Sequence, residues 1–293
     1  MSLQLETALG LGNKYSKIAS KFREIPLISA PLMCLIIFAH QAVPGYPLVV
    51  AANRDEFFPR PTQHADFWSD SASEAQLLAG RDLQAGGTWL GISRGGKVAA
   101  VTNIRDPSQL EEKPRSRGEL PVEFLQCALT PEQYCATLTE TFNQYAGYNL
   151  LVGDQTDMYY VNNFEGVVEK LAPGTYGVSN GLLNSAWPKV TAGRDRMQAL
   201  LASPDVLKTE QLIAMMGDRH QAKDAELPET GMSLEMERQL SSAFIHNTDR
   251  EYGTRCSTAI IAESDGRTRF NEQNFDADGL PTSNHFFEFK RLN

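Results

Sequence analysis

Short apolar runs separated by turn-forming residues recur near both ends of the chain. The runs "CLIIFA" and "PLVVAA" are rich in β-branched and aliphatic residues and flank the turn-rich segment "HQAVPGYP". Similar runs surround Gly95-Gly96 and Asp265-Gly266, which are typical two-residue hairpin turns. The segments 148–163 and 285–292 also alternate as strands do. The pattern therefore predicts several antiparallel strand pairs.

Helical patterns gather in the middle of the chain. Residues 116–129 and 130–145 read as helices, and Thr130-Pro131 opens the second as N-cap and first helical residue. Residues 186–203 and 203–218 read as amphipathic helices, and residues 218–253 as irregular. Strand pairs at the ends and helices in the middle predict an α+β fold, with antiparallel sheets covered by helices on their outer faces.

Composition and charge exclude several classes of protein. The 293 residues are 42% hydrophobic and 22% charged, with a net charge of −9, so no nucleic-acid partner is expected. Four cysteines and five histidines show no metal-ligand spacing, and no metal site is expected. So few cysteines favour a reducing compartment, and no apolar run is long enough to span a bilayer. We expect a cytoplasmic protein without a transmembrane segment.

Residues 1–32 differ from the remainder of the chain. They contain basic residues followed by an apolar segment that two prolines break, and Met33 stands where a signal peptidase needs a small residue. We expect an N-terminal extension that is poorly ordered or results from a misassigned start. Residues 33–293 are expected to form a single domain.

Polar residues with catalytic potential follow the predicted strands. If the first hairpin is symmetric about Val43–Pro44, Cys34 lies opposite Asn53, and adjacent strands are about 4.8 Å apart. Arg54 and Asp55 then lie at the same end of the sheet as Cys34. Three further residues stand at ends of extended runs, namely Asn103, Asn180 and Arg255.

This set of residues fits one known design for a cysteine nucleophile. No histidine is placed to activate Cys34, but the α-amine of Cys34 could do so if Met33 and all preceding residues were removed. An α-amine has a pKa of about 7.7–8.0, near neutral pH. Aspartate would orient the amine, arginine would hold the thiolate, and asparagine amides would donate to an oxyanion.

Taken together, "MC", "AANRDEF", "GGTWLGIS", "RGEL", "PGTYGVSN" and "YGTRCSTAI" resemble the NRDE family, also called the transport and Golgi organisation protein family. The resemblance extends from Met33 to near the C-terminus. It implies the N-terminal nucleophile hydrolase fold, a four-layer αββα sandwich of two antiparallel sheets. It also implies links to haem trafficking and acyl-lipid metabolism, without a settled reaction.

The same resemblance implies roles for eight residues. The expected catalytic residues are Cys34, Arg54, Asp55, Asn180 and Arg255. The expected substrate-binding residues are Asn53, Glu56 and Asn103. The 32 residues before Met33 depart from the family pattern, because a peptide bond to Cys34 removes the base. A misassigned start, a cleaved extension, or a protein that is no longer a hydrolase would each explain them.

Two functions from different classes remain open. The first is a cysteine amide or acyl hydrolase that acts on a small amphipathic or lipid-like ligand and requires no cofactor. The second is a carrier that binds haem or an acyl thioester in the same cleft without turnover. Each residue also has a purely structural explanation: Cys34 as a core residue, Arg54–Asp55 as an ion pair, and the asparagines as turn residues. A trafficking scaffold is a third, weaker interpretation.

Overall fold

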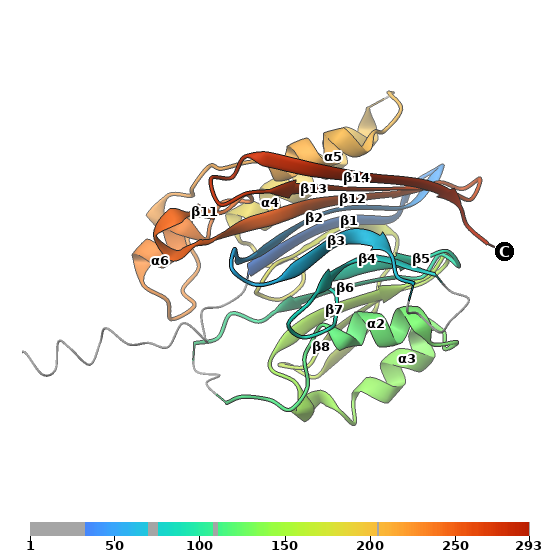
Figure 1. Ribbon diagram of the computed structural model, residues 1–293, viewed down its shortest axis with the longest axis horizontal. Helices are drawn as coiled ribbons and strands as arrows, with labels where there is room; N and C mark the ends of the chain where they lie inside the picture. The colour runs from blue at the N-terminus through green and yellow to red at the C-terminus, as the bar shows by residue number, and fades with distance from the viewer. Residues whose placement is uncertain (1–32, 70–75, 108–110, 204, 293) are drawn as a thin grey trace, which may run out of the picture. The chain divides into compact units, whose positions relative to one another are not determined.

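Two antiparallel sheets stack face to face in the computed structural model, which describes residues 33–69, 76–107, 111–203 and 205–292 (Figure 1). The prediction for residues 1–32 lies outside this range. Within it, each sheet has seven strands. The first sheet has the order β10-β1-β2-β12-β13-β14, with β11 beside β12, and the second runs in sequence from β3 to β9.

The strands of the first sheet come from both ends of the described chain, except for β10, which comes from its middle. They are β1 (Met33–Val43), β2 (Tyr46–Phe57), β10 (Gly174–Val178), β11 (His246–Asn247), β12 (Tyr252–Ala262), β13 (Arg267–Phe275) and β14 (Pro281–Lys290). The second sheet comprises β3 (Thr62–Phe67), β4 (Leu77–Asp82), β5 (Leu90–Ser93), β6 (Val98–Asn103), β7 (Tyr148–Gly153), β8 (Met158–Asn162) and β9 (Val167–Lys170).

Helices cover the outer face of each sheet. Helices α4 (Pro188–Ala202) and α5 (Thr209–Met216) pack on the first sheet, and α2 (Glu119–Gln126) and α3 (Pro131–Leu138) pack on the second (Figure 1). A short helix, α6 (Leu234–Gln239), precedes β11. The expected α+β fold, a four-layer αββα sandwich, is therefore confirmed.

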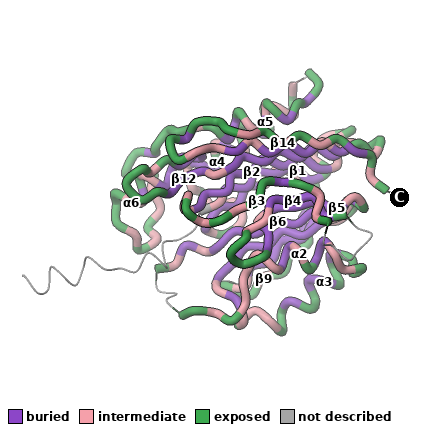
Figure 2. The backbone as a smooth tube through the Cα atoms, viewed as in Figure 1, coloured by how far each residue is buried: buried purple, intermediate pink, exposed green. Residues whose placement is uncertain are grey.

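Strand alternation divides the core into layers. In β1, Ile36 and Phe38 lie in the apolar cluster between the sheets, whereas Leu35 and Ile37 lie in the cluster formed with α4 and α5. Both faces of the strand are therefore buried, as Figure 2 shows for the central strands. Each such side chain contributes about 1.5–3 kcal/mol, which fixes the strand and any polar residue at its end.

The register of the first hairpin differs from the prediction by one residue. Cys34 pairs with Arg54, and Asn53 pairs with Leu35. The turn lies one residue later than expected, because Val43 pairs with Tyr46, and an irregularity between His40 and Val43 removes one residue from the ladder. A one-residue shift moves side chains to the opposite face, so it changes which polar residues share a face with Cys34.

The other predicted elements agree well with the structure, apart from short strands. Thr130 caps α3 in a capping box with Pro131 at its first position. The hairpins at Gly95-Gly96 and Asp265-Gly266 form as β5–β6 and β12–β13. Strands β3, β4 and β9 were not expected from the sequence, and the segment 218–253, expected to be irregular, contains α6 and β11.

Candidate active site

Cys34 lines a pocket between the two sheets at the start of β1. The pocket has a volume of about 130 Å³. Its lining includes Cys34, Arg54, Asp55, Glu56, Asp82, Asn103 and Arg117. Five of the eight residues expected from the sequence therefore line one pocket. Pockets that enclose a drug-sized ligand measure about 300–1,000 Å³, so this pocket has room for only the reacting end of a larger molecule.

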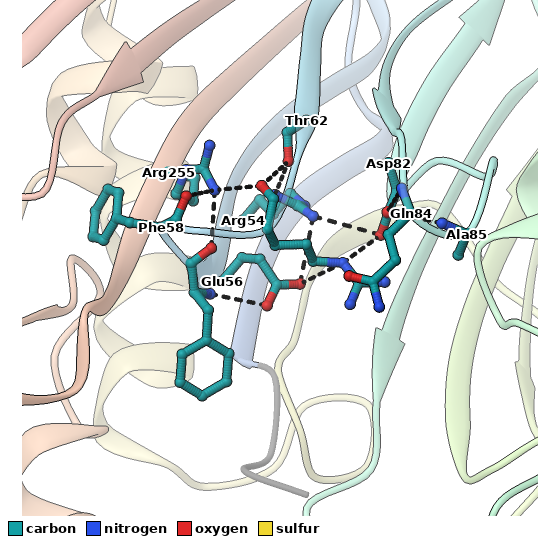
Figure 3. A network of polar contacts seen from close by, with 10 residues as sticks. Arg54, Glu56, Phe58, Thr62, Asp82, Gln84, Ala85 and Arg255 are labelled. Atoms are coloured by element: carbon teal, nitrogen blue, oxygen red, sulfur yellow. Dashed lines mark hydrogen bonds and ion pairs between the residues drawn. The ribbon is translucent and has the colours of Figure 1, made fainter. Parts of the chain in front are cut away.

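A charge network forms one wall of the pocket. Figure 3 shows Arg54 between Glu56 and Asp82, with its guanidinium 3.4 Å from Glu56 Oε2 and 3.7 Å from Asp82 Oδ2. Arg60 approaches the same two carboxylates, at 2.8 Å from Asp82 and 3.5 Å from Glu56. The Arg54 guanidinium also lies 4.3 Å from the centre of the Trp89 ring. The two arginines and two carboxylates balance in charge, which stabilises a rigid wall.

A close contact between Gly87 and Gly118 forms another part of the pocket wall. The Thr88 amide donates to the Gly118 carbonyl at 2.9 Å, which joins the loop before β5 to the start of α2. A Cβ atom on Gly87 would lie 2.3 Å from the carbonyl carbon of Gly118, so only glycine permits this approach. The contact joins the sequence stretches "GGTW" and "RGEL" and presents Arg117 to the pocket.

Arg117 is the cation of the pocket that no carboxylate neutralises directly. Its Nη1 donates to the Gly147 carbonyl at 3.1 Å, and none of the described carboxylates forms an ion pair with it. Burial lowers the pKa of Arg117, whereas the charges of Cys34 and Glu56 act in the opposite direction. An arginine with an unpaired charge beside the thiol is suited to an anionic group on a ligand.

Asn180 orients Asn103 rather than lining the pocket itself. Its Nδ2 donates to Asn103 Oδ1 at 2.7 Å and to the Asn103 carbonyl at 3.0 Å. The Asn103 Nδ2 donates to none of the described residues and can therefore serve a ligand. Ser179 joins this pair to the strand, because its hydroxyl donates to the Cys34 carbonyl at 2.8 Å.

Asp55 is buried with one oxygen unused. Its Oδ1 accepts from the Thr254 hydroxyl at 2.6 Å, whereas Oδ2 has no hydrogen-bond partner among the described residues. Burial raises the pKa of Asp55 from 3.8 to about 7, although the charge of Lys189 and the Thr254 hydrogen bond oppose the rise. Since the register pairs Asp55 with Met33, the carboxylate lies beside the residue that precedes Cys34.

The thiol of Cys34 is not activated while Cys34 remains bonded to Met33. Burial, followed by the charge of Asp55, raises the pKa of Cys34 from 9.0 to about 12. A hydrogen bond from the Asp55 backbone amide and the charge of Arg54 act against this rise. A thiol in this state is protonated at neutral pH and needs a base to become a nucleophile.

Two further expected residues, like Asn180, lie outside the pocket lining and have their own partners. The first is Asn53, which donates to the Met216 and Ala243 carbonyls at 2.9 and 2.8 Å and accepts from Ser257. These bonds place it on the helix side of the sheet, as the corrected register requires.

The second is Arg255, which supports the turn after β2. Its Nη1 donates to the carbonyls of Phe57, Phe58 and Arg60 at 2.9–3.1 Å (Figure 3). It occupies an irregularity in β12 between Thr254 and Cys256. Its role in catalysis stays a prediction.

Sequence reasoning missed Arg117 and Lys189. Arg117 lies in the "RGEL" stretch, so attention to its charge could have found it. Lys189 lies on α4, far along the chain from Cys34, yet its charge acts on both Asp55 and Cys34. No local signal marks it, because its position depends on how α4 packs on the sheet.

Among the described residues, no group of histidine, cysteine and carboxylate side chains is arranged to hold a metal ion. The described helices include none with the length and apolar character needed to cross a membrane. All four cysteines are free thiols.

The class defined by this fold and site is an αββα sandwich with a pocket cysteine at the start of its first strand. The family model "Transport and Golgi organisation 2" matches residues 33–277. A Bos taurus protein, "Transport and Golgi organization protein 2 homolog", is 34% identical over 88% of this chain and 100% of its own length. The Homo sapiens protein of that name is 35% identical over 82% and 92%.

The chain therefore belongs to the Transport and Golgi organisation 2 family.

Two solved structures of low identity also resemble it. A Caenorhabditis elegans N-acylethanolamine-hydrolyzing acid amidase ortholog matches with a TM-score of 0.45 and 10% identity, over 78% of this chain and 92% of that one. A mutant of the conjugated bile acid hydrolase from Clostridium perfringens matches with a TM-score of 0.45 and 8% identity, over 88% and 97%.

Proposed function

We propose that this protein is a cysteine hydrolase of amide or thioester bonds, and that it becomes active when Cys34 is the first residue. The observation that carries the proposal is the unpartnered Oδ2 of Asp55, a buried carboxylate oxygen on the residue that pairs with Met33, directly before Cys34. An unpaired buried carboxylate is costly, and an N–H group of a free α-amine would satisfy it.

The proposed reaction uses residues that line or adjoin the pocket. The α-amine takes the thiol proton, and the thiolate attacks the acyl carbonyl. The Asn103 Nδ2, held by Asn180, donates to the oxyanion, a type of contact worth about 10²–10³ in rate. The α-ammonium then protonates the leaving amine or thiol. Water hydrolyses the thioester on Cys34 and releases the acid, so the net reaction consumes one water.

The ligand is proposed to carry an anionic group near the reacting carbonyl. Arg117 offers an unpaired cation beside Cys34, whereas Arg54 and Arg60 are already neutralised. The small volume of the pocket favours a ligand whose remaining, lipid-like part stays outside. We further propose a cytoplasmic location, where the Cys34 thiol stays reduced.

The test compares two forms of the chain. One form is produced with Cys34 first, by cleavage of a removable tag, and the other retains all residues before it. Both are incubated with N-acyl amino acids and acyl thioesters, and intact mass is measured over time. We expect an acyl adduct on Cys34 and product release only in the form that begins at Cys34. Equal adduct formation in both forms would contradict the amine-base mechanism.

A second candidate function is binding without turnover. The raised pKa of Cys34 in the longer chain favours it, since a protonated thiol is a poor nucleophile. In that case the pocket would hold one end of an acyl thioester, or a propionate of haem, against Arg117. Titration of the full chain with each ligand, followed by calorimetry and by haem absorbance, tests this function. Cys34→Ala should leave acyl-thioester affinity unchanged if the protein is a carrier.

A further inference from the structure

Lys189 occupies a position that is unfavourable for a lysine. It lies in the first turn of α4, where the helix dipole disfavours a cation, and it is 5% exposed. Its Nζ has no hydrogen-bond partner among the described residues. Burial without partners costs a charged group several kcal/mol. Buried charged groups without partners occur mainly at functional sites, which indicates a functional role for Lys189.

The packing of α4 places this lysine close to the site. Gly193, one turn further along α4, lies against Ile37 of β1, and a Cβ atom there would approach Ile37 to 2.7 Å. The helix therefore lies unusually close to β1, the strand that carries Cys34. Lys189 stands at the end of α4 nearest the Cys34 end of the sheet, and its charge acts on Cys34 and Asp55.

Charged or titratable groups from four parts of the fold face Lys189. They are Asp55 of β2, Cys34 of β1, Arg105 of the segment after β6, and Glu237 of α6. Glu237 is already occupied, because Arg105 binds its Oε2 and the Thr230 hydroxyl donates to its Oε1. Asp55 is therefore the remaining anion for Lys189.

No direct ion pair joins Lys189 to Asp55 in the described part of the chain. Lys189 Nζ and Asp55 Oδ2 are both buried, and both lack a partner. Each of the two groups therefore keeps the capacity for a further polar contact. The register pairs Asp55 of β2 with Met33 of β1, and the Cys34 nitrogen follows Met33 directly along β1.

We infer that Lys189 is a positioning residue that keeps Asp55 ionised and the α-amine of Cys34 unprotonated, so that the amine can act as a base. The inference rests on the proposed function. Asp55 accepts a hydrogen bond from the amine and orients it. The nearby ammonium of Lys189 repels a second positive charge, which disfavours the α-ammonium form before the thiol proton is transferred.

The charge states agree with this arrangement. Burial lowers the pKa of Lys189 to about 8, and Arg105 adds to the lowering, whereas Asp55 and Cys34 oppose it. For Asp55, Lys189 is the largest influence against burial, ahead of Thr254 and Arg54, while Glu56 adds to the rise. Lys189 and Asp55 therefore sustain each other's charges near neutral pH.

The test measures whether the α-amine is free, without any turnover. The chain beginning at Cys34 is suitable, because its described core clusters use residues from Leu35 to Phe289. It is treated with 2-cyanobenzothiazole, which condenses with a cysteine whose amine and thiol are both free, and the rate is measured against pH. In Lys189→Met we expect the half-maximal rate to move up by about one pH unit or more, because a repelling cation is lost. At a fixed pH well below the midpoint, a shift of one pH unit lowers the rate of the variant about ten-fold relative to the parent.

Two variants serve as controls. Lys189→Arg keeps the charge and should keep the profile near that of the parent. Lys97→Met removes a lysine that donates to carbonyls at the end of α2, so it should alter stability but not the profile. A folded Lys189→Met with an unchanged midpoint overturns the inference. If Lys189→Met does not fold, Asp55→Asn is compared with Asp55→Asn/Lys189→Met, and coincident profiles of these two overturn it equally.

Discussion

Consecutive polar residues of β2 lie on opposite faces of the strand and have different surroundings. Arg54 and Glu56 face the space between the sheets, where they form a charge-balanced wall with Arg60 and Asp82. Asn53 and Asp55 face the helices, where Asn53 satisfies backbone carbonyls and Asp55 keeps one oxygen unpaired. A single motif therefore supplies a pocket wall on one face and an electrostatic support on the other.

The largest expected effect is on the pocket face. Arg54→Leu leaves the buried Glu56 carboxylate and the Asp82 carboxylate with less compensation and removes the contact with Trp89. Removing one partner of a buried ion pair costs about 3–5 kcal/mol. Urea denaturation at pH 7 measures this loss in the free energy of unfolding.

Arg60→Leu is the matched control. Its side chain is 23% exposed against 5% for Arg54, although it contacts the same two carboxylates. Water screens the more exposed charge, so a loss of about 1 kcal/mol or less is expected. Equal losses for the two arginines would mean that burial does not set the stability of this wall.

Asn53→Leu tests the helix face and has a smaller expected effect. It leaves the Met216 and Ala243 carbonyls and the Ser257 hydroxyl without their partner. We expect a loss of about 2–3 kcal/mol in the free energy of unfolding, since unsatisfied buried polar groups cost about 1–3 kcal/mol each. The rate of iodoacetamide alkylation at Cys34 should not change.

Ser257→Ala removes only one of these hydrogen bonds and should cost about 1 kcal/mol. If Asn53→Leu instead slowed alkylation and left stability intact, Asn53 would belong with the substrate-binding residues, as the sequence suggested.

Asp55→Asn tests the unpaired carboxylate through pH. The folded protein retains the Asp55 proton up to about pH 7, whereas the unfolded chain loses it near 3.8. This proton therefore stabilises the fold below about pH 4, and its contribution is lost as pH rises to about 7. The free energy of unfolding should fall by at most about 1.4 kcal/mol per pH unit in this range, and Asp55→Asn should remove that part of the slope.

Urea denaturation from pH 4 to 7.5 provides the measurement, and the slope of the parent minus that of the variant isolates Asp55. Asp249→Asn, at an exposed position, removes the same formal charge and should leave the slope unchanged. Parallel curves for the parent and Asp55→Asn would mean that the carboxyl titrates normally.

The sequence predicted the layers and most of the hairpins because alternating apolar runs and turn residues act locally. The family motifs also indicated Cys34, Arg54, Asp55, Glu56 and Asn103, which line one pocket. The error at Asn53 has a physical cause: the irregularity after His40 shifts the ladder by one residue, and no residue type announces such a shift.

Lys189 is a residue of the site that local sequence patterns could not indicate. Its role depends on the close approach of α4 to β1, which a glycine permits, and on an oxygen of Asp55 that nothing else satisfies among the described residues. Both facts are properties of tertiary packing between segments more than a hundred residues apart. The sequence pattern alone indicates only an amphipathic helix with a lysine near its start.

The smallest expected effect concerns Arg117, the pocket cation without a partner carboxylate. In the chain beginning at Cys34, we compare alkylation by the anion iodoacetate with alkylation by neutral iodoacetamide. Arg117→Gln should lower the iodoacetate rate relative to the iodoacetamide rate by about five-fold, since one nearby charge is worth about 1 kcal/mol when partly hydrated. Arg60→Gln provides the control, because Arg60 is already paired with Asp82 and should change the ratio little. An unchanged ratio in Arg117→Gln would remove the support for an anionic ligand, while the cysteine mechanism itself would still stand on Asp55.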